Sequence, residues 1–173
     1  MAFQAATKAF LSFLQKHPEV RHQIRAGPGR TLLYAGSFFK PMWKEIADYK
    51  RAHPEVAEKQ MLPDVLARIP MPGTRYVSLL AYVQEFERQV PWQPDGFTVW
   101  RALSGIFASN ANGAVSFQIG SGVEAGQKVF AATEASVLSR NPDVDATTKD
   151  LLSYFQRCIQ SKQANINLGY ISA

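Results

Sequence analysis

Residues 97–119 read FTVWRALSGIFASNANGAVSFQI. Helical spacing predicts a helix over residues 98–108, with Trp100 and Ser104 one turn apart on the same face. The residues from 110 to 113 favour a turn, and the apolar stretch 114–119 predicts a strand. A helix that leads into a strand in this way indicates an α/β fold.

The rest of the chain supports a mixed fold. Strands are predicted at 31–35, 129–137 and 164–169, and helices at 3–16, 41–53, 58–69, 75–89 and 143–160. We expect the 173 residues to form a single α/β unit. A mostly helical N-terminal lobe, residues 1–95, would pack on an α/β lobe, residues 96–173. Its small, mainly parallel four-stranded sheet would have flanking helices, and strand 31–35 would join that sheet. A cleft between the lobes is the expected site.

Composition narrows the function. Hydrophobic residues make up 46% and charged residues 19%, which permits a sizeable core. The net charge of +5 suits an anionic ligand, but the basic residues are dispersed and no nucleic-acid motif occurs, so no nucleic-acid partner is expected. Cys158 is the only cysteine, and with three scattered histidines no metal site is expected. No stretch has the length of a membrane span. The fold needs no oxidising compartment, so the sequence is compatible with the cytosol or with delivery into a target cell's cytosol.

Glu134 is the foremost candidate for chemistry. It follows the small residues 131–133 at the end of the predicted strand, where a carboxylate can oppose positive charge on a sugar during glycosidic bond cleavage. A structural carboxylate bonded to backbone at a strand end is an equally good interpretation. No second carboxylate stands nearby in sequence, which disfavours a two-carboxylate glycosidase.

Each of the other candidate site residues also has a structural interpretation that requires no ligand. The Trp100 indole can stack on a flat ring, or it can be a core residue of an amphipathic helix. Ser104 can donate to a phosphate, or it can be a solvated hydroxyl. Tyr34, at the end of strand 31–35, can line a site or fill the core. The glycine-rich loop 120–126 matches neither dinucleotide-binding nor phosphate-loop fingerprints.

These residues lie in two motifs, Val99-Trp100-Arg101-Ala102-Leu103-Ser104 and Val129-Phe130-Ala131-Ala132-Thr133-Glu134. Both resemble motifs of the ADP-ribosyl cyclase and NAD glycohydrolase family, a Trp-x-x-x-Ser helix and a segment ending in the catalytic glutamate. Leu32-Leu33-Tyr34 stands where the family has Leu-Leu-Trp. The first helix and the last strand are also similar, so the resemblance spans nearly the whole chain.

The resemblance implies an enzyme that cleaves the nicotinamide–ribose bond of NAD. Glu134 would be the catalytic carboxylate, and Trp100 would stack on nicotinamide. Tyr34 would form the opposite wall, while Ser104 and the backbone near Phe130 would meet the phosphates. NAD would be the substrate, with no further cofactor. An NAD-depleting toxin or effector domain, with an immunity or inhibitor protein as partner, is one setting for this activity.

Several positions depart from the family pattern. Tyr34 replaces a tryptophan, and Ala35 and Gly36 replace a Ser-Arg phosphate contact. Residues 62–64, Leu-Pro-Asp, occupy the position of a Leu-Glu-Asp motif, which in the family sets the balance between hydrolysis and cyclisation. These departures leave the product open between ADP-ribose and cyclic ADP-ribose. The alternative function is a non-catalytic helical binding or adaptor module on the same scaffold.

Overall fold

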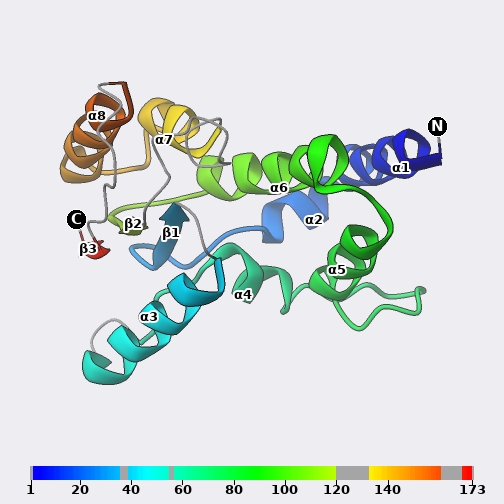
Figure 1. Ribbon diagram of the computed structural model, residues 1–173, viewed down its shortest axis with the longest axis horizontal. Helices are drawn as coiled ribbons and strands as arrows, with labels where there is room; N and C mark the ends of the chain where they lie inside the picture. The colour runs from blue at the N-terminus through cyan, green and yellow to red at the C-terminus, as the bar shows by residue number, and fades with distance from the viewer. Residues whose placement is uncertain (1, 36–38, 55–56, 120–132, 161–168, 173) are drawn as a thin grey trace.

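The computed structural model describes residues 2–35, 39–54, 57–119, 133–160 and 169–172 (Figure 1). Helices predominate in it. Their bounds are α1 Ala2–Lys16, α2 Pro18–Gln23, α3 Phe39–Ala52, α4 Leu62–Leu66, α5 Leu79–Gln89, α6 Phe97–Ser109, α7 Ala135–Arg140 and α8 Ala146–Gln160. The segment Trp92–Gly96, whose backbone is non-helical at Gln93, leads into α6 through a kink. The predicted helix over 98–108 is confirmed and extends by one residue at each end.

The strands form one sheet in the order β1-β2-β3, with β1 at Thr31–Ala35, β2 at Val115–Ile119 and β3 at Gly169–Ser172. β1 and β2 run parallel in the register Thr31 to Val115, which confirms the predicted pairing of the first two strands. β3 joins β2 antiparallel. The sheet is therefore mixed in the described residues, and the predicted strand 164–169 lies outside them except for its last residue.

The third predicted strand, 129–137, is wrong over its described part. Residues 133 and 134 form a helical turn, and 135–137 belong to α7. Leu138 of α7 is fully buried in the core, so packing of this helix outweighs the strand preference of Val137 and the residues before it. Residues 129–132 lie outside the described part of the chain, and a fourth strand does not appear in the described residues.

Local polar contacts decide where three helices begin. The Ser78 hydroxyl accepts from the Ala81 N–H, so α5 starts at Leu79 and not at the predicted residue 75. The Asp145 carboxylate accepts from the Thr148 N–H at 2.8 Å, and α8 begins at Ala146 and not at the predicted residue 143. Asp64 accepts from the Met61 N–H at 3.0 Å and caps α4, where Pro63 is tolerated in the first turn.

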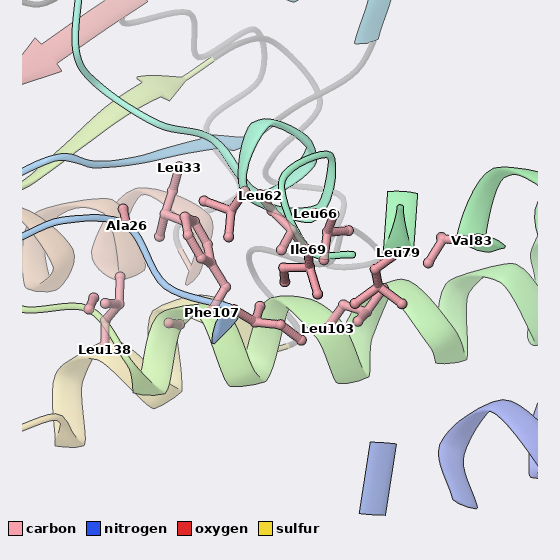
Figure 2. Packing of buried hydrophobic residues seen from close by; sticks show 14 of the residues in the cluster. Ala26, Leu33, Leu62, Leu66, Ile69, Leu79, Val83, Leu103, Phe107 and Leu138 are labelled. Atoms are coloured by element: carbon pink, nitrogen blue, oxygen red, sulfur yellow. The ribbon is translucent and has the colours of Figure 1, made fainter. Parts of the chain in front are cut away.

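The main core joins residues from both predicted lobes. It runs from Phe10 of α1 to Phe155 of α8 in one cluster of buried side chains. Figure 2 shows Leu103 and Phe107 of α6 directed toward Leu62, Leu66 and Ile69. All five side chains are at most 4% exposed. α6 contacts α1, α4 and α7, so it is the helix around which the site is assembled.

The two faces of β1 meet different partners because successive side chains point to opposite faces of a strand. Leu33 belongs to the main core, together with Val115 and Phe117 of β2. Leu32 packs with Ile46 of α3 and Met61 in a second cluster, and Tyr34 lies against that cluster. Figure 1 accordingly shows α3 and α8 on different sides of the sheet. Tyr34 is thus held near the carboxyl end of β1.

Candidate active site

Glu134 lies at the start of a helix and not at the end of a strand. Its backbone is already helical, with φ −60° and ψ −46°, and α7 begins at the next residue. The side chain is buried, at 6% exposure. The prediction of a carboxylate at a sheet edge is therefore wrong in its local structure, whereas the residue itself is buried beside α6.

Three residues of α6 hold the segment that carries Glu134. The Ser104 hydroxyl donates a hydrogen bond to the Glu134 carboxylate. One turn earlier, Arg101 Nε donates to Thr133 Oγ1 at 2.7 Å. Gly105 lets the segment approach, because a Cβ at that position would lie 3.3 Å from Thr133 Cγ2. Residues from the two predicted motifs, some thirty positions apart in the sequence, thus meet directly.

Burial raises the pKa of Glu134 to about 8, and the hydrogen bond from Ser104 opposes this rise. An ionised carboxylate loses water on burial, and a single hydroxyl replaces only part of that solvation. At neutral pH the group is therefore mostly a neutral acid. A cation placed beside it would favour ionisation by Coulomb attraction.

Two carboxylates affect the pKa of the Tyr34 phenol. Burial raises the pKa of its phenol, and the negative charges of Glu134 and Glu87 raise it further. The phenol therefore stays neutral over the physiological range. Charges from the start of α7 and from the end of α5 thus both act on Tyr34 of β1.

Trp100 lies one turn before Ser104 in α6 and is half-buried. Its side chain packs against the main core. It therefore has the contacts expected of a core residue on one side and keeps a part of its surface accessible. Its stacking on a ligand stays a prediction.

The remaining predicted residues are only partly described. Ala35 ends β1 and pairs with Ile119. Gly36 and Phe130 lie outside the described residues. The resemblance assigned Asp64 to a product-determining motif, but its carboxylate caps α4. The two residues before it, Leu62 and Pro63, are buried.

Sequence reasoning missed two charged residues. Arg101 shares the face of Ser104 at a spacing of three residues, a signal that helical geometry offered and that was not used. Glu87 is an exposed residue of α5, and nothing in the sequence links it to Tyr34. A shallow groove of about 460 Å³ opens beside Arg101; its lining is Leu11, Thr98, Arg101, Ala102, Gly105, Ile106, Ser109 and Thr133.

No family model, curated protein or solved structure matches the chain. Among the described residues, no group of three or more His, Cys, Asp or Glu side chains is placed to hold a metal ion. None of the helices in the described ranges is long and apolar enough to cross a membrane.

Proposed function

We propose that the protein cleaves the nicotinamide–ribose bond of NAD to give nicotinamide and ADP-ribose. The observation that carries the proposal is the hydrogen bond from Arg101 of α6 to Thr133 beside the buried Glu134, whose pKa the Ser104 hydroxyl lowers. It joins the two motifs that suggested this chemistry. Tyr34 stands near the same carboxylate, and Trp100 lies one turn away on α6.

In this proposal Glu134 acts by charge. The bond between the ring nitrogen and the ribose C1′ breaks, its electron pair stays on nitrogen, and nicotinamide leaves as a neutral molecule. The ribosyl cation that develops is opposed by the ionised carboxylate of Glu134. A water oxygen then bonds to C1′ and releases one proton, which gives ADP-ribose.

The buried setting of Glu134 suits this role. An electrostatic interaction is stronger where water is excluded, so a carboxylate with few other partners acts strongly on a nearby cation. The nicotinamide ring of NAD is itself cationic. Its arrival would lower the pKa of Glu134 from about 8 and produce the ionised form in the complex. Arg101, an exposed cation beside Thr133, is available for the phosphates.

A second function has an observation of its own in its favour. Trp100 packs against the core, and an uncharged Glu134 bonded to Ser104 is a satisfied structural group. Both are compatible with a non-catalytic binding or adaptor module. In that case the purified protein does not consume NAD.

The deciding experiment is incubation of the protein with NAD, with separation of the products by chromatography at early times. We expect nicotinamide and ADP-ribose, and we expect Glu134→Gln to abolish their formation while the protein remains folded. Ser139→Ala, which removes an exposed hydroxyl that donates to the Ser136 carbonyl nearby in sequence, is the matched control. NAD left intact by the wild-type protein would contradict the proposal.

Product identity is a separate part of the proposal. Tyr34 is smaller than the tryptophan of the family pattern, and a smaller wall admits water to the ribosyl cation. ADP-ribose should therefore exceed cyclic ADP-ribose at early times. Cyclic ADP-ribose as the main early product would overturn this part and leave the role of Glu134 intact. Depletion of NAD in a target cell, restrained by an inhibitor protein, is the setting we propose for such an activity.

A further inference from the structure

A second groove lies between the end of α5 and the turn before α6. It measures about 390 Å³, and its lining is Gln84, Glu87, Arg88, Trp92 and Gly96. Trp92 is 48% exposed, which is unusual for so large an apolar side chain. None of the groove residues takes part in the proposed step at Glu134.

The Trp92 indole is held as a flat platform. One side packs on Gly96, where an added Cβ would lie only 3.0 Å from Trp92 Cε3. Phe97 meets the ring edge-on, with centroids 6.0 Å apart and planes at 77°. Its orientation is therefore fixed before any ligand arrives. A rigid, exposed indole is a stacking surface for a flat base, since every nucleobase has a π face.

Polar groups of two kinds share the groove with this platform. Gln84, Glu87 and Arg88 lie on one face of α5, since they are spaced by three and four residues. The carboxylate and amide offer acceptors for amino and hydroxyl groups. The Arg88 guanidinium offers five donors and a permanent positive charge, a combination suited to phosphate.

One residue of the groove also acts electrostatically on the candidate active site. Glu87 lines the groove, and its charge acts on Tyr34, which senses Glu134 as well. A molecule whose reacting sugar lies against Glu134 can therefore extend past Tyr34 toward α5. NAD has such a shape, with a diphosphate and an adenosine on the far side of the reacting ribose.

We propose that this groove binds the adenosine monophosphate half of NAD, with the adenine stacked on Trp92 and Arg88 paired with phosphate. Gln84 and Glu87 accept hydrogen bonds from donors of the adenosine. The inference rests on the proposed NAD cleavage and adds to it a site for the part of the substrate that does not react. Binding there contributes to kcat/KM without touching the bond that breaks.

The test compares NAD with nicotinamide mononucleotide, which has the scissile bond but lacks the adenosine monophosphate half. Trp92→Ala should lower kcat/KM for NAD by about ten- to a hundredfold, the usual effect of losing one base-stacking aromatic ring. It should leave kcat/KM for nicotinamide mononucleotide within about twofold of wild type. Tyr154→Ala on α8 is the matched control, because Tyr154 is an aromatic residue of similar exposure, 45%. It should change neither value.

An equal loss for both substrates would overturn the inference, because Trp92 would then act on the nicotinamide half or through the fold. No loss for either would overturn it as well. Binding of AMP, measured by calorimetry on the wild type and on Trp92→Ala, decides the matter where no turnover is seen. AMP binding that requires Trp92, in a protein that leaves NAD intact, keeps the groove and rejects the cleavage. NAD cleavage without Trp92-dependent AMP binding keeps the cleavage and rejects the groove.

Discussion

The two ends of α7 present two buried polar side chains to α6 in very different states. Glu134 precedes the helix and Asn141 follows it, and they are 6% and 5% exposed. The Asn141 amide donates to the carbonyls of Ala108, Ser109 and Ala111 at 3.0, 3.1 and 2.9 Å, which closes the end of α6. Its own carbonyl accepts from the Asp143 N–H at 2.9 Å. Among the described residues, Glu134 has the Ser104 hydroxyl as its hydrogen-bond partner, and burial raises its pKa to about 8.

Asn141 therefore stabilises the fold, whereas ionised Glu134 destabilises it. The Asn141 amide adds a donor to carbonyls at and just after the end of α6, where intrahelical donors run out. Ionised Glu134 is destabilising, because its solvation is lost and only partly replaced. A buried group of the second kind is typical of functional sites, where strain in the free protein is relieved by the ligand.

The largest expected effect comes from Glu134→Gln. Turnover of NAD should fall on the order of a hundredfold or more, since an electrostatic stabiliser of the transition state is removed. The stability of the variant relative to wild type should instead increase, and the increase should grow with pH. In the wild type, the Glu134 carboxyl contributes its full stabilisation of the fold below its ordinary pKa of 4.5. This contribution is lost as the pH rises through about 8. The variant lacks this loss.

Denaturant unfolding of both proteins at several pH values measures the effect. Between pH 5 and pH 9, the stability of the variant relative to wild type should rise by about 3–5 kcal/mol. A relative stability that is constant with pH would show that Glu134 is not a destabilised carboxylate, and the contrast with Asn141 would fail.

Asn141→Ala should have the opposite signature and the next largest effect. It removes the amide donor from the carbonyls of Ala108, Ser109 and Ala111, so the free energy of unfolding should fall by about 1–3 kcal/mol. The loss should not vary with pH, because an amide does not titrate. Turnover per folded molecule should stay near the wild-type value. A variant as stable as wild type would mean that water replaces the amide, and the comparison would lose its stabilising half.

How far the sequence predicts this molecule differs between the same two regions. Apolar periodicity was sufficient for α1, α6 and the pairing of β1 with β2. The spacing placed Ser104 on the face of α6 that meets Glu134, while the role of Trp100 stays a prediction. The helical start of α7 was not predictable from small residues with weak preferences, because its packing against α6 comes from residues some thirty positions away. For the same reason, Asn141 drew no notice in the sequence.

The pKa shifts of the site residues were the property that the sequence predicted least well. Glu134 stood out in the sequence through its motif, but its raised pKa follows from burial that only the fold creates. Glu87 and Trp92 come from α5 and from the turn before α6, and they line one groove only in the folded chain. Single residues on exposed faces carry no periodic signal, so a groove assembled from them stays hidden until the chain is folded.

Ser104→Ala should have a smaller effect on activity, and the effect should depend on pH. The hydroxyl lowers the pKa of Glu134, so its loss should raise that pKa further. If the ionised carboxylate is the active form, kcat/KM for NAD falls below pH 8 and levels off above it. In the variant, the midpoint of this profile should move to higher pH, so the deficit is several-fold at pH 7 and shrinks in alkaline solution. Ser104→Thr, which keeps a hydroxyl, should restore the midpoint. An unshifted midpoint in Ser104→Ala would separate the hydroxyl from the titration of Glu134.

The smallest effect is expected from Gly105→Ala, which tests how closely the Glu134 segment must approach α6. The added Cβ would meet Thr133 Cγ2 at 3.3 Å, so Thr133 has to shift by a few tenths of an ångström. Alanine favours the helix by up to about 1 kcal/mol, which offsets the crowding, so stability should remain within about 1 kcal/mol of wild type. Turnover should nevertheless fall several-fold, because the residue that moves is bonded to the one that carries the carboxylate, and small displacements of a reacting group reduce rates steeply.

The double variant Gly105→Ala with Thr133→Ser decides whether this loss comes from the approach itself. Serine removes the Cγ2 methyl that the new Cβ would meet and keeps the oxygen that accepts from Arg101 Nε. Turnover should therefore return toward the wild-type value in the double variant, and Thr133→Ser alone should change it little. A double variant as slow as Gly105→Ala would show that the glycine acts elsewhere than against Thr133. Close packing at this end of α7 would then have no part in placing Glu134, and the hydrogen bonds from Ser104 and from Arg101 to Thr133 would position it.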